Sequence, residues 1–259
     1  MIQILMVDSV PSLLEVGKIF LEREEGFVVD TSSSVADALK RLENRDYDII
    51  VFDFHMPEMN GMDFLVKIRT TYQNLPIIVF TGMDREETAH EALNRGADFY
   101  VERCGSPRYI YADLTHKIKR AVGVCRAEKS LVKSEKQFLE LVDLLPLPVF
   151  ETDRNGEFTF ANKSAHKIFG YPENDLITGK NIVEMVIPEE REVVATHLDM
   201  CLNGKAIDIC EYTAHRENGS TFPIIIHSGP ISDNDYIYGI RVLLLISQNQ
   251  RNNRDYRIS

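Results

Sequence analysis

The sequence predicts an α/β domain built on a doubly wound parallel sheet, followed by an α+β domain built on an antiparallel sheet. Short apolar runs alternate with amphipathic stretches of helical length over the first ~105 residues, which is typical of a parallel sheet covered by helices on both faces. After residue 148 the order changes to strands, then helices, then strands again, which favours an antiparallel sheet. The length of 259 residues agrees with two domains.

The first domain is predicted to hold five strands and four intervening helices. The apolar runs lie at 2–7, 27–31, 48–52, 76–81 and 97–101. The stretches with helical periodicity lie at 11–24, 34–45, 61–72 and 84–95. Pro11 suits the first turn of a helix, and Gly26 and the "NRGAD" segment at 94–98 end the helices before them.

A long helical pattern follows, from Pro107 to about Leu145. Its first part carries one apolar stripe, formed by Leu114, Ile118, Ala121, Val122 and Cys125. The next part, "RAEKSLVKSEKQ" at 126–137, is strongly polar. We therefore expect the last helix of the first domain, which ends at about residue 122, to continue into a solvated helical connector at 123–137. A short parallel coiled coil is an alternative that two weak heptads leave open.

The second domain is expected at 138–248. The segment "VFETDRNGEFTFAN" at 149–162 predicts two strands joined by an Asn-Gly turn. Helical pieces follow, the longest at 189–203. Three strand-like runs then lie at 208–216, 220–231 and 236–246, the first two joined by "ENG". The polar tail at 249–259 is expected to be disordered.

Composition excludes several classes of function. A net charge of −11 argues against nucleic-acid binding. The longest aliphatic run, "VLLLI" at 242–246, is too short to span a bilayer, and the N-terminus enters a strand pattern at once, so we expect a cytoplasmic protein. The four cysteines form no CxxC pair and no zinc-type cluster, so free thiols are expected.

Polar residues gather where the predicted parallel strands end. Asp8 and Asp53 end the first and third strands, Thr81 ends the fourth, and Arg103 follows the fifth. In a doubly wound sheet, ligands bind beyond the carboxyl ends of the strands. Two carboxylates, a hydroxyl and a cation are therefore expected at one edge, beside the distinctive loop "DFHMPEMNG" at 53–61.

These residues carry a resemblance to the receiver domain of response regulators, over residues 1 to about 122. The loop reads D-x-x-M-P-x-M-x-G, and Thr81-Gly82 and "GADFYVER" at 96–103 follow in the same order and spacing. The resemblance implies a flavodoxin-like five-stranded sheet. It also implies that Asp53 accepts a phosphoryl group, that Thr81 and Tyr100 act as the switch, and that Met83 tunes dephosphorylation. Arg103 occupies the position of the family's lysine.

The resemblance further implies a Mg²⁺ site, because phosphoryl transfer to a carboxylate depends on positioning and charge neutralisation. The expected ligands are Asp8, Asp53 and the backbone carbonyl of His55. The family's second acid is Ser9 here, so the site falls from three carboxylates to two, and Ser9 is expected to bind the metal weakly or through water. A side-chain ligand role for His55 is less favoured than an exposed loop histidine.

Two interpretations of this site stay open. In the first, a partner histidine kinase phosphorylates Asp53 and the residues Thr81 and Arg103 assist. In the second, the domain is a pseudo-receiver that serves as a docking scaffold. The intact phosphoacceptor loop and Thr81-Gly82 favour the first, although a fold alone does not guarantee activity.

The second domain resembles a PAS domain. The stretches that carry the resemblance lie at 138–162, at 168–171 with "DLITGKN" after them, and at 215–231. PAS domains often hold a ligand, but Ile182 stands where photoactive flavin members have cysteine, which argues against flavin. His197 is the candidate axial ligand for heme, about one turn from the expected position, which argues against heme. An apolar metabolite pocket and a plain protein-interaction module both stay open, so the PAS ligand is unknown.

The expected function is that of a two-component response regulator without a DNA-binding output. Leu245-Ile246-Ser247 replaces the Asp-Ile-Thr with which kinase-linked PAS domains usually end. We expect a histidine kinase as partner, further signalling proteins such as another response regulator, and homodimerisation as an option. The sequence shows no nucleophile–base pair, so we expect a phosphoacceptor rather than an enzyme, with Mg²⁺-dependent self-phosphotransfer and dephosphorylation at most. The layout resembles archaeal, methanogen-type regulators.

Overall fold

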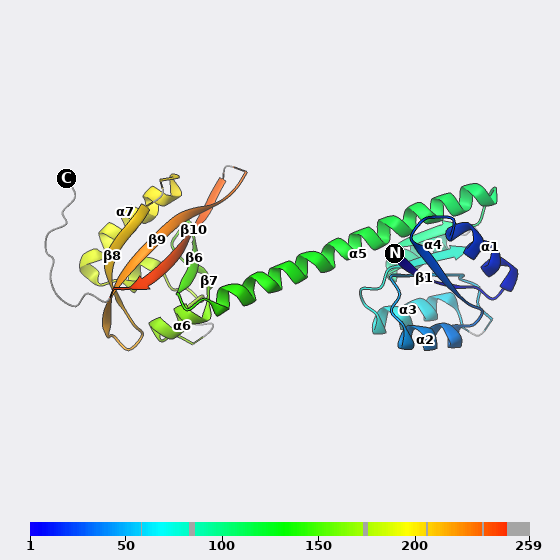
Figure 1. Cartoon of the computed structure of the whole chain (residues 1–259), viewed down its shortest axis with the longest axis horizontal. Helices are drawn as coiled ribbons and strands as arrows, with labels where there is room; N and C mark the ends of the chain where they lie inside the picture. The colour runs from blue at the N-terminus through cyan, green and yellow to red at the C-terminus, as the bar shows by residue number, and fades with distance from the viewer. Residues whose placement is uncertain (58, 83–85, 173–175, 206, 235, 248–259) are drawn as a thin grey trace. The chain divides into compact units, whose positions relative to one another are not determined.

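The computed structural model describes residues 1–57, 59–82, 86–172, 176–205, 207–234 and 236–247, without the side chains of 86–88, 207 and 208. The chain separates into two compact units, Met1–Lys133 and Ser134–Ser259, which are drawn together in Figure 1. The Met83 position and the 249–259 tail, for which roles or disorder were predicted, lie outside the described residues. Within those residues, no helix has the length and apolar character needed to cross a membrane.

The first unit contains the predicted parallel sheet. Its strands are β1 (Ile2–Val7), β2 (Phe27–Ser32), β3 (Ile49–Phe52), β4 (Ile77–Thr81) and β5 (Phe99–Glu102). Their order is β2-β1-β3-β4-β5, and every neighbouring pair is parallel. The central strands are buried on both faces, which explains their uninterrupted apolar sequences. The predicted flavodoxin-like fold is confirmed.

Helices cover both faces of this sheet. They are α1 (Pro11–Leu21), α2 (Val35–Asn44), α3 (Gly61–Thr71) and α4 (Glu86–Asn94). Proline occupies the first turn of α1, and the side chains of Ser34 and Asn60 cap α2 and α3. Two apolar cores result, one on each face of the sheet. The carboxyl edge between them is left to polar side chains.

A single helix, α5 (Pro107–Leu144), continues from the first unit into the second. Its first part buries Leu114, Ile118 and Val122 against the core that also contains β1 and β4 residues. Beyond that part, Val124, Leu131 and Phe138 follow one another at seven-residue intervals and are exposed. The expected helical connector is thus continuous with the last helix of the first unit, and these three apolar side chains are exposed.

The second unit has the predicted antiparallel sheet. Its strands are β6 (Val149–Asp153), β7 (Phe158–Ala161), β8 (Ile207–His215), β9 (Thr221–Asp233) and β10 (Tyr236–Ile246). Their order is β7-β6-β10-β9-β8, with antiparallel neighbours throughout. The helices α6 (Lys163–Phe169) and α7 (Arg191–Leu202) and two short 3₁₀ turns at 182–185 and 188–190 lie between β7 and β8.

The predicted Asn-Gly turn joins β6 to β7. Gly156 adopts a φ of +83°, which favours glycine at this position. The Asp153 carboxylate accepts hydrogen bonds from the backbone N–H groups of Asn155 and Glu157, both at 2.9 Å. These contacts satisfy the turn's backbone and fix the register of the hairpin.

Candidate phosphoacceptor site

Four of the predicted site residues meet at the carboxyl edge of the parallel sheet. Asp8, Asp53 and Arg103 directly follow β1, β3 and β5, and Thr81 is the last residue of β4. Backbone bonds carry the ladder one residue past the strands, from Asp53 N–H to the Val7 carbonyl at 2.9 Å and from Arg103 N–H to the Thr81 carbonyl at 2.8 Å. The side chains at this edge are therefore positioned by the sheet rather than by mobile loops.

Asp8 is a fully buried carboxylate, with 0% of its surface exposed. Its Oδ1 atom accepts a hydrogen bond from the backbone N–H of Val10 at 2.8 Å. Its Oδ2 atom lies 2.5 Å from Nη2 of Arg103, without the alignment of a hydrogen bond. The residue that ends the first apolar strand is thus held by a turn on one side and a cation on the other.

Asp53 is 9% exposed, so its carboxylate reaches solvent from a largely buried position. Burial raises the pKa of Asp53, and the nearby charge of Asp8 acts in the same direction. The Arg103 cation and hydrogen bonds from the Thr81 hydroxyl and the His55 backbone N–H lower the pKa but do not cancel the effect of burial. The result is a carboxylate that is less well solvated than an ordinary surface aspartate.

Arg103 leans toward Asp8 rather than toward Asp53. Its Nη2 atom lies 3.9 Å from Oδ1 of Asp53, against 2.5 Å from Asp8. The same nitrogen donates to the backbone carbonyl of Phe80 at 2.7 Å, and the guanidinium carbon lies 4.5 Å from the centre of the Phe80 ring. The sequence predicted the cation at this edge but not this pairing.

The oxygen atoms at this edge fit a Mg²⁺ ion, although only two of the groups that would bind it are negatively charged. Oδ2 of Asp8 and Oδ1 of Asp53 are buried and have no hydrogen-bond partner among the residues that the structure describes. The Ser9 hydroxyl lies 3.5 Å from the His55 carbonyl oxygen. Carboxylate, carbonyl and hydroxyl oxygens suit this hard cation. Over the described part of the chain, no group of three or more His, Cys, Asp or Glu side chains forms a metal cluster. The metal would thus rely on two carboxylates, Asp8 and Asp53, with the His55 carbonyl and Ser9 beside them.

The other predicted residues of the site take more ordinary positions. The His55 side chain is exposed and packs edge-on against the Phe54 ring at 5.3 Å between centroids. Tyr100, on β5, is half-buried and packs against the core that contains β3 and β4 residues. The proposed switch partners Thr81 and Tyr100 therefore come from neighbouring strands of one sheet.

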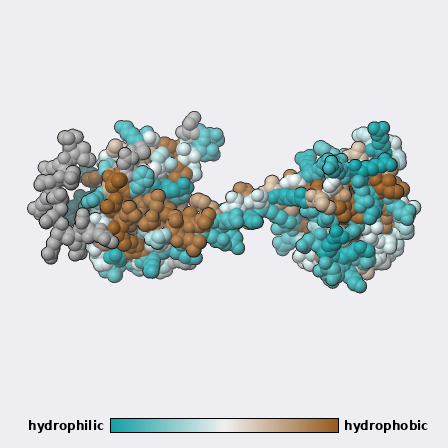
Figure 2. Space-filling model, in the orientation of Figure 1, coloured by the Kyte–Doolittle hydropathy of each residue, from teal (hydrophilic) through white to brown (hydrophobic). Residues whose placement is uncertain are grey.

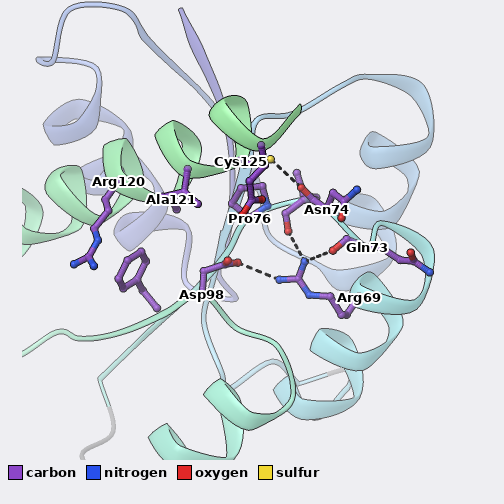
Figure 3. A pocket seen from close by; sticks show the side chains of 12 residues that line it. Arg69, Gln73, Asn74, Pro76, Asp98, Arg120, Ala121 and Cys125 are labelled. Carbon is purple, nitrogen blue, oxygen red and sulfur yellow. Dashed lines mark hydrogen bonds and ion pairs between the residues drawn. The ribbon is translucent and has the colours of Figure 1, made fainter. Parts of the chain in front are cut away.

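The opposite edge of the parallel sheet holds a pocket of about 320 Å³, shown in Figure 3. Arg69 crosses it, donating to the carbonyls of Gln73 and Leu75 at 2.8 Å and pairing with Asp98 at 3.1 Å. These bonds commit the arginine to loop carbonyls at the start of β4. The pocket therefore lies at the amino ends of the strands, away from Asp53, and its arginine connects structural elements.

Among the described residues, side chains fill most of the space between α7 and the sheet of the second unit. A cavity of about 20 Å³ remains between α7 and the sheet, which has room for about one water molecule. His197, the heme candidate, is half-buried there and its Nδ1 atom is hydrogen-bonded to the Tyr212 hydroxyl. Burial, followed by the nearby Cys210, raises the pKa of Tyr212. His197 is thus part of a polar cluster within the core.

Comparisons with protein families match both halves of the chain. The model described as the response regulator receiver domain matches residues 4–115, and the model of the PAS fold matches residues 136–243. The site at the edge of the first unit lies inside the first match. The fold and the family match together define the first unit as a receiver domain, which is a domain of two-component signalling. The chain thus contains a response regulator receiver domain followed by a PAS domain.

Individual relatives match the receiver half. The response regulator SaeR of Staphylococcus aureus (strain USA300) is 32% identical over 120 residues, which are 46% of this chain and 52% of SaeR. The chain thus spans about half the length of the curated relatives it matches. A CheY-like receiver domain protein from Methanospirillum hungatei JF-1 is 30% identical, with a TM-score of 0.45 over 49% of this chain and 98% of that one. The Thermotoga maritima response regulator TrrA, solved in complex with Mg²⁺ and BeF, is 28% identical, with a TM-score of 0.42 over 47% and 99%.

The raised pKa of Asp53 leads to a prediction about stability. The folded state raises the pKa of Asp53 above its ordinary value, so folding favours the protonated side chain. The contribution of Asp53 to the free energy of unfolding is therefore fully present below its unfolded-state pKa and is lost as pH rises through its folded-state pKa. Asp53→Asn cannot ionise, so we expect it to be more stable than wild type near neutral pH, with the gain disappearing at acidic pH. Urea unfolding at about pH 7 and about pH 4 measures this.

Asp63→Asn is the matched control for this prediction. Asp63 is exposed in the first turn of α3, where a negative charge favours the helix. Its replacement should lower rather than raise stability at neutral pH. Equal changes in the free energy of unfolding for the two substitutions would contradict the view that ionised Asp53 destabilises the fold.

Proposed function

We propose that Asp53 accepts a phosphoryl group from a partner histidine kinase. The observation that carries this proposal is the position of the Asp53 carboxylate, which reaches solvent at the carboxyl edge of the sheet between the Thr81 hydroxyl and the Arg103 cation. A phosphoryl group on Asp53 would meet a hydrogen-bond donor on one side and a positive charge on the other. Both stabilise the charge that the transferred group carries.

The transfer needs few groups from the protein. A carboxylate oxygen of Asp53 attacks the phosphorus atom, the new O–P bond forms, and the N–P bond to the kinase histidine breaks. The imidazole leaves with the electron pair of that bond. When bound, Mg²⁺ supplies neutralisation of the phosphoryl oxygens. The chain's own residues position the carboxylate, and water later hydrolyses the acyl phosphate, so we class the protein as a phosphoacceptor.

A kinase would dock on the surface beside this edge. The exposed apolar residues Val10, Val16 and Ile19 lie at and along α1, which starts three residues after Asp8. Apolar side chains on a solvent-facing helix support contact with a second protein. We infer that α1 contributes to the kinase-binding surface.

The phosphoryl signal would pass from the switch residues to α5 and the PAS domain. Thr81 and Tyr100 would move toward the phosphoryl group and change the face formed by α4, β5 and α5. The second unit shows a broad apolar area in Figure 2. The exposed apolar residues of this unit include Phe138 and Leu141 of α5 and Leu243 and Leu245 of β10. This surface supports binding of another signalling protein or of a second copy of the chain.

A ligand-sensing PAS protein with a pseudo-receiver is the second candidate function. Ser9 in place of an acid and the pairing of Arg103 with Asp8 favour it, since both leave less negative charge for a metal. The docking-scaffold role would then belong to the receiver unit. The cavity of about 20 Å³ gives a ligand little space without rearrangement of the PAS core.

Incubation with acetyl phosphate and Mg²⁺ tests the proposed function. We expect the intact mass to rise by about 80 Da in the wild type, the mass of one phosphoryl group, and to stay unchanged in Asp53→Ala. Sedimentation velocity on the same samples shows whether the oligomeric state changes with phosphorylation.

Two further arms separate the candidates. One arm omits the metal, and the other uses Ser9→Asp, which restores a third carboxylate. No mass gain in the wild type but a gain in Ser9→Asp would show that two carboxylates are too few, and would favour the docking scaffold. A gain that persists in Asp53→Ala would overturn Asp53 as the acceptor.

A further inference from the structure

The cation of the phosphoacceptor site is shared unequally between its two acids. Nη2 of Arg103 lies 2.5 Å from Oδ2 of Asp8 and 3.9 Å from Oδ1 of Asp53. Asp8 is fully buried, and a buried carboxylate without a nearby cation is strongly unfavourable. In the resting protein, Asp8 therefore holds the arginine.

Three contacts keep the guanidinium in this place. It pairs with Asp8, donates to the Phe80 carbonyl at 2.7 Å, and lies over the Phe80 ring at 4.5 Å. A planar guanidinium stacks on a ring and offers several donors at once, whereas an ammonium group is a compact point charge without a stacking face. The arginine at this position thus allows a pairing that a lysine would hold less firmly.

We propose that Arg103 and Mg²⁺ compete for Asp8, and that the displaced guanidinium turns to the anion on Asp53. The inference rests on the proposed function, because that anion is the phosphoryl group. The Oδ2 atom that faces Arg103 is the carboxylate oxygen that a metal would need, and Ser9 offers no second acid in its place. A metal ion and the arginine cannot both hold this oxygen at short range.

The charges of the site set the direction of the effect. Asp8, Asp53 and Arg103 together leave one net negative charge. A divalent cation alone reverses that sign, and a phosphoryl group alone, with a charge of about −2, deepens it. The two together nearly cancel the charge of the site. Each ligand therefore favours the other, and by thermodynamic linkage the coupling acts equally in both directions.

Mg²⁺ binding measured by titration calorimetry tests the competition. For the wild type we expect weak binding that becomes about tenfold tighter when beryllofluoride, a phosphoryl analogue, occupies Asp53. Arg103→Lys keeps the positive charge but loosens the pairing, so we expect it to bind Mg²⁺ alone more tightly than the wild type. Arg103→Met should bind Mg²⁺ alone more tightly still, and beryllofluoride should tighten its Mg²⁺ binding by a smaller factor than in the wild type, because no arginine remains to be released.

Matched variants keep the test decisive. Arg69→Met removes an arginine that is bonded to carbonyls at the opposite edge of the sheet, and we expect it to leave Mg²⁺ binding unchanged. If Arg103→Met does not fold, Arg103→Lys and Phe80→Leu test the competition instead. Phe80→Leu removes the ring under the guanidinium and keeps the charge of Arg103. Unchanged or weaker Mg²⁺ binding in folded Arg103 variants overturns the proposal.

The titration needs no phosphoryl donor, so its failure is distinct from failure of phosphorylation. Tighter metal binding in the Arg103 variants without any mass gain from acetyl phosphate would support the competition and overturn the proposed function. A mass gain that depends on Asp53, together with Mg²⁺ binding that does not change in the Arg103 variants, would support the proposed function and overturn the competition.

Discussion

Asn162→Ala is expected to destabilise the PAS unit by about 3 kcal/mol or more. The side chain is fully buried. Its Nδ2 atom donates to the carbonyls of Val142 and Leu147, both at 2.9 Å, and its Oδ1 atom accepts from the backbone N–H groups of Val149 and Ala165, both at 3.0 Å. One amide thus joins the end of α5, the start of β6 and the first turn of α6. Removing it leaves four backbone groups without this partner.

Hydrogen exchange measured by mass spectrometry reports this loss within the PAS unit alone. A loss of about 3 kcal/mol accelerates globally protected exchange by about a hundredfold. Peptides from β6, β9 and β10 should show the effect, whereas peptides from β1 to β5 should not.

Asn203→Ala is the matched control for Asn162→Ala. Asn203 is exposed and its Nδ2 atom bonds only to the carbonyl of Asp199, at 2.8 Å, among the contacts described for that atom. We expect a cost below about 1 kcal/mol. Similar acceleration in both variants would contradict the view that Asn162 is the junction of three elements.

The sequence was sufficient for the element order of the first unit, because its strands and helices have clearly different periods. The runs "ILMV" and "DIIVF" have the length and composition of doubly buried strands, and they became β1 and β3. Asp8 and Asp53 end these runs, so their place at one edge follows from parallel pairing alone. The positions of Thr81 and Tyr100, the predicted switch residues, follow in the same way from β4 and β5.

The choice of Arg103 between the two acids could not be read from the sequence. Long arginine side chains reach either carboxylate from the end of β5, and the result depends on the Phe80 carbonyl and ring from the neighbouring strand. Phe80 directly precedes Thr81, which was a signal for a stacking surface near the cation. Packing in three dimensions was needed to show that the surface is used.

The junction at Asn162 was also missed, although its local signal is present. An asparagine directly before a helical stretch is a common N-cap, and Asn162 caps α6. Its two bonds to the carbonyls of residues 142 and 147 could not be predicted from a helical or strand period, because they reach across the turn between α5 and β6. The size of the PAS cavity is equally hidden from sequence, since it depends on how α7 side chains fill the sheet face.

Gly61→Ala is expected to slow phosphorylation of Asp53 by at least about tenfold and to cost about 1–3 kcal/mol of stability. A Cβ atom at this position would lie 2.5 Å from the Phe54 carbonyl oxygen and 2.8 Å from the Phe54 Cα atom. These are backbone atoms, so the loop itself must move. Phe54 directly follows Asp53, and its movement would displace the carboxylate. The rate of mass gain with acetyl phosphate and urea unfolding measure the two effects.

Gly123→Ala separates a general effect of added methyl groups from this clash. Gly123 is exposed in α5, and a Cβ atom there would meet nothing within 4 Å. Alanine favours a helix over glycine by about 1 kcal/mol, so this variant should be at least as stable as the wild type and should accept the phosphoryl group at the wild-type rate. Normal phosphorylation of Gly61→Ala would mean that the 53–61 loop tolerates displacement, and that β3 alone positions the Asp53 carboxylate. Slowed phosphorylation with only a modest loss of stability would show instead that the loop holds the carboxylate in place for attack.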